Sequence, residues 1–311
     1  MTNKKDIFLL IDGSAIVHRA YHAMPPLTTS KGFDTGAIHG FFSMLLKVIQ
    51  QFDASYVAVA FDRPVPTFRQ QLYVGYQAQR PKLESDLSDQ FGAIIAILAD
   101  AKIPTYAVDG YEADDIIGTI AEKAKDMGSL VYILTGDRDM MQLVNDMTHI
   151  IMPLKGISEV SIYDEEKVKE KFGVPPEKII ELKALQGDQS DNYPGVPGVG
   201  PKTAATLVGD YETVEGIYEH LGDIQAKNPK LAERLVAGAE HAILGKKLAT
   251  ILHDVPFVYD VKDTDIKKFD IEGWKKSLEE YEMKSLPKRI DEVFLKDGTV
   301  NLDGKGQMKL I

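Results

Sequence analysis

The sequence predicts an α/β protein that is built on a parallel sheet and followed by a helical domain. Four short runs have the near-continuous apolar character of strands buried on both faces: residues 7–11, 56–61, 105–108 and 130–134. Helical patterns alternate with these runs from residue 6 to about residue 165, which is typical of a parallel sheet. After Asp164 only short helical patterns follow, so we expect a domain boundary near residue 170.

The individual helices follow from apolar residues that recur every three or four positions. In the first domain this spacing covers residues 36–51, 90–102 and 115–127. In the second it covers residues 177–186, 202–208 and 229–252. We therefore divide the chain into an α/β domain over residues 1–170, a helical domain over residues 171–290 and a polar, glycine-bearing tail over residues 291–311.

The bulk composition excludes several classes of protein. With 311 residues, 44% hydrophobic and 27% charged, the chain has the profile of a globular protein with at least one full core. It has no cysteine, which excludes disulfides, cysteine zinc sites and a thiol nucleophile. The seven histidines lack the HExxH spacing of zinc proteases. No apolar run reaches membrane-spanning length and none near the N-terminus resembles a secretory signal, so we expect a cytoplasmic monomer.

Nine acidic residues lie where apolar runs end, most of them in tight pairs. They are Asp12, Asp62, Glu112, Asp114, Asp115, Asp137, Asp139, Asp188 and Asp191. Ligands of parallel α/β sheets bind outside the carboxyl ends of the strands, so we expect these groups at one edge of the sheet. Carboxylates gathered there would repel one another unless cations neutralised them, and hard oxygen ligands favour Mg²⁺ or Mn²⁺.

Taken singly, the acidic motifs have simpler explanations. Glu112 and Asp115 precede a helical pattern and could serve as its cap, since acidic residues suit a first turn. Asp137 and Asp139 could belong to an exposed turn, and the loop from Asp188 is rich in turn-forming residues. Their conjunction favours a metal site, because capping and turns do not predict an acidic residue after every strand of the sheet.

A carboxylate cluster of this density suits a site for two divalent ions. In such sites one ion lowers the pKa of an attacking water, and both neutralise oxygens during a displacement at phosphorus. No Ser-His-Asp or Cys-His arrangement competes for the role of nucleophile. The formal net charge of −11 is unusual for a nucleic-acid binder, but the nine carboxylates account for most of it and bound ions would offset them.

Residues 195–204, Gly-Val-Pro-Gly-Val-Gly-Pro-Lys-Thr-Ala, form a hairpin that suits a phosphate ligand. Gly198 and Gly200 allow close backbone approach, and Pro201 suits the first position of a helix whose free amides attract an anion. Lys202 adds a cation at the same place. A plain loop between two helices is the alternative, whereas a Walker A loop is excluded because its GxxxxGK[ST] spacing is absent.

A basic and aromatic insert follows Asp62. Residues 63–82 contain four basic and three aromatic side chains, and no acidic one occurs before Glu84. In an acidic protein such a segment is expected to meet phosphates and exposed bases. A solvated amphipathic helix is the alternative explanation.

Together these motifs resemble the 5′ nuclease family, in particular the 5′→3′ exonuclease domain at the N-terminus of bacterial DNA polymerase I. The matching strings are Ile11-Asp-Gly-Ser14, Phe61-Asp62 with Thr67-Phe-Arg69, Gly-Tyr-Glu-Ala-Asp-Asp-Ile-Ile over residues 110–117, Leu-Thr-Gly-Asp-Arg-Asp over residues 134–139, and the segment over residues 185–200. They occur in the same order as in the family across residues 6–290. The resemblance implies a PIN-like core, a helical arch at about residues 63–90 and a helix–three-turn–helix clamp at about residues 187–209.

The resemblance also assigns roles to single residues. It implies a first metal site at Asp12, Asp62, Glu112 and Asp114, and a second at Asp137, Asp139, Asp188 and Asp191. It implies a supporting role for Asp115, which we group with Arg69 and Arg80 as catalytic, and DNA contacts at Arg19, Gly198, Gly200, Lys202 and Thr203. Relatives often hold K⁺ at the clamp. Two positions depart from the family pattern: Gln77, where lysine is usual, and Pro64, near which a lysine or a small residue is usual.

We therefore expect a 5′→3′ exonuclease or 5′-flap endonuclease that acts on DNA 5′ ends, flaps and nicked or gapped duplex in replication or repair, with RNA primers as a further substrate. It resembles the stand-alone exonuclease that some bacteria carry beside polymerase I. Three alternatives have distinct signatures. A PIN-like ribonuclease would lack the glycine hairpin, a haloacid-dehalogenase phosphatase needs a second acid at the position of Ser14, and a DNA-binding module without catalysis would lack the carboxylates.

Overall fold

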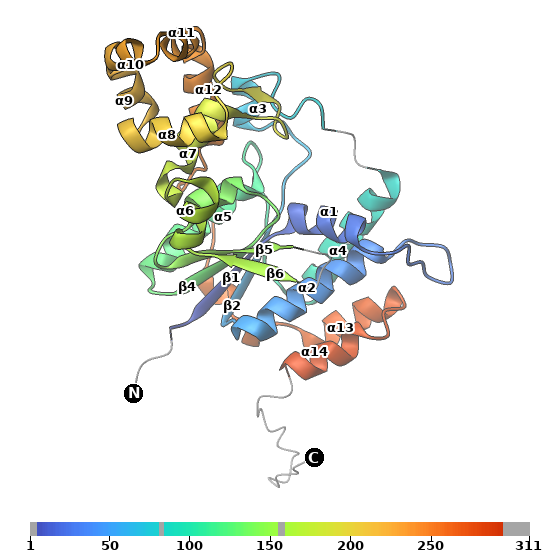
Figure 1. Ribbon diagram of the computed structural model, residues 1–311. Helices are drawn as coiled ribbons and strands as arrows, with labels where there is room; N and C mark the ends of the chain where they lie inside the picture. Colours follow the sequence, from blue (N-terminus) through green and yellow to red (C-terminus); the bar gives the residue numbers. More distant parts are fainter. Residues whose placement is uncertain (1–4, 81–83, 155–158, 295–311) are drawn as a thin grey trace, which may run out of the picture.

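A six-stranded sheet lies at the centre of the molecule. The computed structural model describes residues 5–80, 84–154 and 159–294 (Figure 1). The strands are β1 (Ile7–Asp12), β2 (Tyr56–Ala60), β3 (Thr105–Tyr106), β4 (Leu130–Leu134), β5 (Thr148–Pro153) and β6 (Val160–Tyr163). Their order is β3-β2-β1-β4-β5-β6, and every neighbouring pair is parallel except β5 and β6.

The sheet is thus mixed, whereas the sequence predicted a parallel one. The connection from β5 to β6 spans only residues 154–159, which is too short for the crossover that a parallel pair needs. The expectation that every strand ends in an acidic residue is also wrong, since β5 ends at Pro153 and is followed by Leu154. Strands β1, β2 and β4 are the ones that deliver carboxylates to the sheet edge.

Each face of the sheet has its own hydrophobic cluster, because successive side chains of a strand point to opposite faces. Leu9 and Ile11 face a cluster that includes buried residues of α1 (Gly13–Ala23), α2 (Gly36–Phe52) and α4 (Ser85–Asp100). Phe8 and Leu10 face the other cluster, which includes α5 (Ala113–Asp126) and continues into the helical part of the chain. The helical part is therefore fused to the α5 side of the sheet rather than joined by a free linker.

The helical part begins after β6. Its helices are α6 (Glu165–Phe172), α7 (Ile179–Gln186), α8 (Pro201–Tyr211), α9 (Val214–Glu219), α10 (Leu221–Lys227), α11 (Pro229–Ala237) and α12 (Ala239–Ala249). A small antiparallel ladder of β7 (Gly187–Asp188) and β8 (Tyr193–Pro194) lies between α7 and α8. Short 3₁₀ helices are η1 (Asp139–Leu143), η2 (Pro176–Lys178), η3 (Val261–Thr264) and η4 (Ile266–Lys268).

The single helix predicted over residues 229–252 is two helices. The chain breaks at Gly238, between α11 and α12, where a Cβ atom would lie 2.9 Å from Val196 and Pro197. Glycine permits this close approach of the hairpin to the break, and helical periodicity alone does not reveal it. The break brings the Gly195–Gly200 hairpin against the start of α12.

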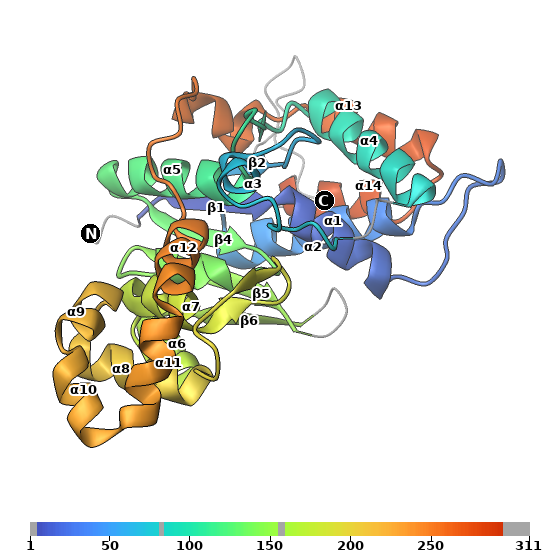
Figure 2. The ribbon, with the colours of Figure 1, turned by 90° about the horizontal axis from the view of Figure 1, so that it is seen from above.

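The last two helices, α13 (Ile271–Glu280) and α14 (Leu286–Phe294), pack on the α/β core. Trp274 is fully buried, and its ring centroid lies 5.8 Å from that of Phe42 and 5.9 Å from that of Phe294. In Figure 2 these helices lie beside α4, far from α9, α10 and α11. The sequence assigned residues 171–290 to one helical domain, but this final part returns to the first domain.

The insert that precedes α4 is only partly helical. Its described residues form α3 (Phe68–Leu72) and a series of turns up to Arg80, and α4 begins at Ser85. The polar tail was predicted to begin at residue 291, but residues 291–294 belong to α14, and the rest of the predicted tail, residues 295–311, lies outside the described residues. Within the described ranges, no helix combines the length and the apolar character that crossing a bilayer requires.

Candidate active site

Eight of the nine predicted carboxylates line one cleft of about 720 Å³ at the carboxyl edge of the sheet. They come from the ends of β1, β2 and β4, from the start of α5 and from the β7–β8 loop. The eight are Asp12, Asp62, Glu112, Asp114, Asp137, Asp139, Asp188 and Asp191. The structure thus brings together residues from both parts of the chain, at the edge where a parallel sheet is expected to bind its ligand.

The two carboxylate oxygens of Asp12 are each held by a hydrogen bond. It ends β1 and caps α1, and its Oδ1 accepts a hydrogen bond of 3.0 Å from the Ala15 amide. Its Oδ2 accepts one of 2.7 Å from the Thr135 hydroxyl. The same Thr135 oxygen accepts a hydrogen bond of 2.9 Å from the Asp137 amide, so one threonine aligns the acids at the ends of β1 and β4.

The start of α5 combines helix capping with a place in the cleft. Glu112 is the cap, and its backbone amide donates to Oδ2 of Asp115 at 3.1 Å in a capping box. Asp62 accepts a hydrogen bond of 2.9 Å from the Ala113 amide, which ties the residue after β2 to the same turn. Capping, considered above as an alternative to metal binding, therefore occurs together with a place in the cleft.

Lys183 forms ion pairs with two of the four carboxylates that were predicted to form the second metal site. Its amino group contacts both Asp139 and Asp188, and its side chain is only 16% exposed. Ser190 also donates to Asp188 through its hydroxyl. Lys183 was not among the residues predicted for the site. The available signal was a lone cation in the middle of the mostly apolar α7.

Asp191 lies where the insert meets the β7–β8 loop. It accepts hydrogen bonds from Arg80 at 2.7 Å, Gln77 at 3.2 Å and the Tyr76 hydroxyl at 3.3 Å. The same Tyr76 hydroxyl lies 3.2 Å from Glu112, so its single proton is divided between the two carboxylates, and Gln77 approaches Glu112 at 3.5 Å. The predicted residue Arg80 and the unusual Gln77 therefore both reach the cleft, while the structural role of the buried Tyr76 was not predicted.

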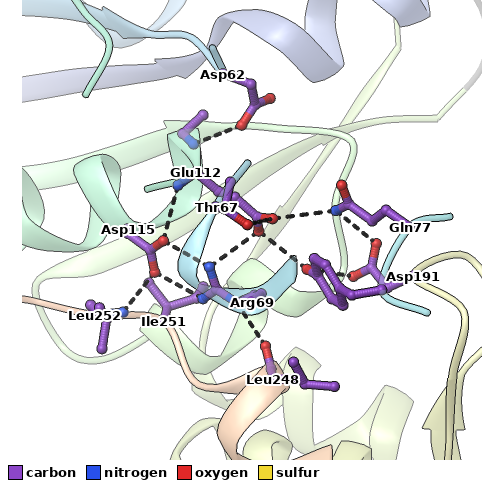
Figure 3. A network of polar contacts seen from close by, with 12 residues as sticks. Asp62, Thr67, Arg69, Gln77, Glu112, Asp115, Asp191, Leu248, Ile251 and Leu252 are labelled. Carbon is purple, nitrogen blue, oxygen red and sulfur yellow. Dashed lines mark hydrogen bonds and ion pairs between the residues drawn. The ribbon is translucent and has the colours of Figure 1, made fainter. Parts of the chain in front are cut away.

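Asp115 does not line the cleft, and Arg69 lines it with almost no exposed surface; Figure 3 shows the two side chains bonded to each other. Asp115 is fully buried, Arg69 is 2% exposed, and their side chains form a two-bonded ion pair at 2.7 and 2.8 Å. A direct catalytic role for Arg69 stays a prediction, and in this arrangement its guanidinium is already bonded to Asp115 and Glu112. Asp115 lies behind Glu112 and bonds its backbone amide, and the supporting role that the resemblance implied stays a prediction.

Burial and mutual repulsion raise the pKa values of several carboxyl groups in the cleft. Burial, followed by the charge of Asp62, raises the pKa of Asp12 to about 7. Burial also raises the pKa of Glu112 to about 7, although Arg69 opposes the change, and together with Asp137 it raises that of Asp139 to about 7. For Asp188 burial acts in the same direction, but the bonds from Lys183 and Ser190 outweigh it and lower the pKa.

These carboxylates provide the oxygen donors of a divalent-ion site, but their present partners are protein cations. Among the residues that the structure describes, no three acidic or histidine side chains are arranged to hold an ion as they stand. Lys183 and Arg80 instead offset part of the negative charge. The chemistry of the donors fits Mg²⁺ or Mn²⁺, whose preferred ligands are carboxylate oxygens.

The glycine hairpin forms a separate feature at the start of α8. Gly198 has a φ of +73°, and its carbonyl accepts a hydrogen bond of 3.2 Å from Arg234. Gly200 caps α8, so the first amides of that helix are free of side-chain capping bonds. Lys202 and Thr203 follow on α8 and line a shallow pocket of about 320 Å³ with residues of α10 and α11.

Arg19, the remaining predicted DNA contact, also lines the main cleft. Its guanidinium donates to the carbonyl of Leu154 at 2.8 Å. The predicted contacts thus divide between two places, with Arg19 at the carboxylates and the hairpin residues at α8.

Comparison with known proteins gives matches along most of the chain. Residues 7–173 match the model of the 5′-3′ exonuclease N-terminal resolvase-like domain, and residues 174–272 match that of the 5′-3′ exonuclease C-terminal SAM fold. A 5′-3′ exonuclease of Aquifex aeolicus is 40% identical over 92% of this chain and 95% of its own. DNA polymerase I of Bacillus subtilis is 40% identical over 88% of this chain, which spans only 31% of that relative.

Solved structures share the fold at low identity. A structure of the D15 protein of phage T5, co-crystallised with metal ions, has a TM-score of 0.62 and 20% identity, and the match covers 93% of this chain and 99% of that one. The catalytic core of Rad2 in complex with a DNA substrate has a TM-score of 0.56 and 20% identity, with coverage of 94% and 92%.

Proposed function

The chain belongs to the 5′-3′ exonuclease family, and from this membership we propose that it hydrolyses phosphodiester bonds of DNA from 5′ ends and at 5′ flaps. The observation that carries the proposal is the single cleft in which eight carboxylates from both parts of the chain meet. A flap endonuclease of phage T5 has been solved in a pseudo-enzyme-product complex with DNA and metal ions, and its fold matches this one with a TM-score of 0.61.

Two divalent ions, Mg²⁺ or Mn²⁺, are part of the proposal. Asp12, Asp62, Glu112 and Asp114 would hold the first, and Asp137, Asp139, Asp188 and Asp191 the second. The raised pKa values of Asp12, Glu112 and Asp139 support this assignment, because each carboxylate would gain from a nearby cation. Such ions lower the pKa of an attacking water and neutralise charge on the phosphate oxygens.

The chain's own cations would hold the phosphate. The Arg80 side chain is 52% exposed, so it can turn from Asp191 towards a substrate. Arg19 lies on the wall of the same cleft. Preorganised cations stabilise the charge that develops at phosphorus more effectively than water does.

The hairpin at the start of α8 would bind the duplex away from the cut. Gly200 leaves room for the backbone of a nucleic acid, Gly198 lies against the Arg234 guanidinium, and Lys202 and Thr203 provide polar groups beside the helix amides. Contacts of this kind position a duplex without reading its sequence. We also propose that this hairpin binds a K⁺ ion.

The test uses a 5′-labelled flap and a nicked duplex with Mg²⁺ or with chelator, and includes a matched RNA flap. Chelator should abolish cleavage, and Asp137→Asn should lower the rate at least about 10²- to 10³-fold, as loss of one preorganised stabilising group does. Asp126→Asn is the matched control, since Asp126 is an exposed acid at the opposite end of α5. Cleavage that resists chelator would refute the proposal, and cleavage of the RNA flap alone would favour the ribonuclease alternative.

A further inference from the structure

Arg69 uses every hydrogen-bond donor that it has. Its Nε donates to the Leu248 carbonyl at 2.8 Å, and one Nη2 hydrogen goes to the Thr250 carbonyl at 2.7 Å. The other bonds reach Asp115 at 2.7 and 2.8 Å and Glu112 at 3.2 Å. Since a guanidinium carries five N–H groups, none is left for a ligand.

Asp115 is equally committed. Its Oδ1 accepts from Arg69 and from the Leu252 amide at 2.9 Å, and its Oδ2 accepts from Arg69 and from the Glu112 amide at 3.1 Å. The carboxylate therefore connects Glu112, which faces the cleft, to the chain at Leu252. Figure 3 shows these bonds converging on the Arg69–Asp115 pair.

The segment 248–255 is the return of the chain from the clamp-bearing helices to the core. Core side chains bond its backbone at successive points: Leu248 and Thr250 to Arg69, Ala249 and Ile251 to Gln142, Leu252 to Asp115 and Val255 to Thr119. The side chains of Leu248, Ala249 and Ile251 line the carboxylate cleft. The return segment is thus a wall of the site, and Arg69 binds both this wall and the carboxylates behind it.

We propose that Arg69 is a positioning residue, which fixes Glu112 relative to the return segment so that the cleft is preorganised for divalent ions. The inference rests on the proposed function for its reaction, but it concerns ion binding by the protein alone. A purely structural role predicts that any comparable loss of a tether to the return segment has the same effect. A positioning role predicts that ion binding weakens only when the Arg69 guanidinium no longer bonds Glu112, Asp115 and the return segment at the same time.

Arg69→Lys is the informative variant, because lysine keeps the charge but cannot make the planar two-pronged bond. Thr119→Val is the matched control, since Thr119 tethers the same segment through Val255 and its hydroxyl donates to the backbone carbonyl of Asp115 instead of to the carboxylate. Mn²⁺ binding to the DNA-free protein would be measured by electron paramagnetic resonance, and duplex binding in chelator and thermal unfolding would be measured alongside.

We expect Arg69→Lys to weaken Mn²⁺ binding about 10- to 100-fold, as loss of a group that orients metal ligands does. Duplex affinity in chelator should stay at the parent value, and Thr119→Val should bind Mn²⁺ as the parent does. Equal Mn²⁺ affinities in Arg69→Lys and the parent, or equal losses in both variants, would overturn the inference. Failure of the proposed function is distinguishable, because then the parent itself would not cleave DNA in a metal-dependent way.

A second measurement on the parent protein keeps the inference testable if Arg69→Lys does not fold. Adding Mg²⁺ should slow amide hydrogen exchange at Glu112 and Leu252 together, since both amides donate to Asp115. The Ile251 amide donates to Gln142 and serves as the internal control. Slower exchange at Glu112 without any change at Leu252 would overturn the coupling.

Discussion

Replacing Gln77 by lysine should raise the rate of cleavage. The Gln77 amide lies 3.2 Å from Asp191 and 3.5 Å from Glu112, so it reaches carboxylates of both proposed metal sites without supplying a charge. Gln77 has a φ of +54°, a conformation that glutamine and lysine tolerate about equally because neither is branched at Cβ. The substitution therefore adds a cation at the cleft without adding backbone strain.

The expected gain is smaller than the full value of one cation. Two opposite unit charges 4 Å apart interact by about 4 kcal/mol near a protein surface, and loss of one preorganised donor typically costs about 2.7–4 kcal/mol of transition-state stabilisation. Arg80 already lies 2.7 Å from the same carboxylate and supplies part of this charge. We therefore expect an acceleration of about tenfold, which corresponds to about 1.4 kcal/mol.

The assay is single-turnover cleavage of a 5′-labelled flap with enzyme in excess and saturating Mg²⁺. Gln77→Met removes the amide without adding charge, so it should stay near the parent rate. Arg80→Ala reports how much the existing guanidinium contributes. Unchanged cleavage by Gln77→Lys together with a large loss in Arg80→Ala would refute the reasoning, because the arginine would then already fill the role. An equal gain in Gln77→Met would show that charge is not the cause.

Three further predictions follow from the same contacts. Lys202→Ala should weaken duplex binding uniformly across sequences and reduce the slope of log affinity against log salt concentration by about 1. Lys169→Ala, at an exposed position of α6, is the control and should change neither quantity. Filter binding over a salt series would check this, and an unchanged slope in Lys202→Ala would exclude the clamp. Lys183→Met should lower the free energy of unfolding by about 3 kcal/mol in chelator, since it leaves Asp139 and Asp188 without their buried partner. Urea titrations should show that Mg²⁺ restores most of the loss, and equal losses with and without Mg²⁺ would contradict this. The metal-free protein should lose stability as pH rises from about 5 to about 7. Asp12 and Asp139 have pKa values of about 7 in the folded state against 3.8 ordinarily, so the folded state binds more protons than the unfolded state in that range. Mg²⁺ should reduce the decline, and stability that rises with pH in chelator would contradict the assignment.

Local patterns were sufficient to predict the part of the fold that positions the site. The apolar runs of β1 and β2 end at Asp12 and Asp62, and that of β4 is followed by Asp137 three positions later, so both signals are short-range. Strands β5 and β6 were missed as strands, and the sheet was taken as wholly parallel. The antiparallel direction of β6 depends on the length of one connection rather than on periodicity. The break at Gly238 depends on a residue of the hairpin some 40 positions earlier, about which helical spacing gives no information.

The candidate site shows the same division between local and distant information. Seven of the nine carboxylates could be identified because each follows a strand or lies at the start of a helix, and those positions meet at one edge of the sheet, whereas Asp188 and Asp191 come after α7. The sequence did not show which basic residues of the insert are buried and which are exposed. Arg69 and Arg80 lie 11 positions apart in one basic insert, yet the first is 2% exposed and the second 52% exposed.

The difference between these two arginines arises from residues far away in the sequence. Arg69 is enclosed because the return segment lies against it, 179 and 181 positions away at Leu248 and Thr250. Arg80 keeps exposed surface although its guanidinium pairs with Asp191, which lies in the β7–β8 loop and lines the cleft. The basic insert therefore offers DNA fewer cations than its composition suggests, since one guanidinium is used to build the site. Among the described residues of the insert that line the cleft, Arg80 is the cation with exposed surface, and we expect it to carry the contact with the phosphate.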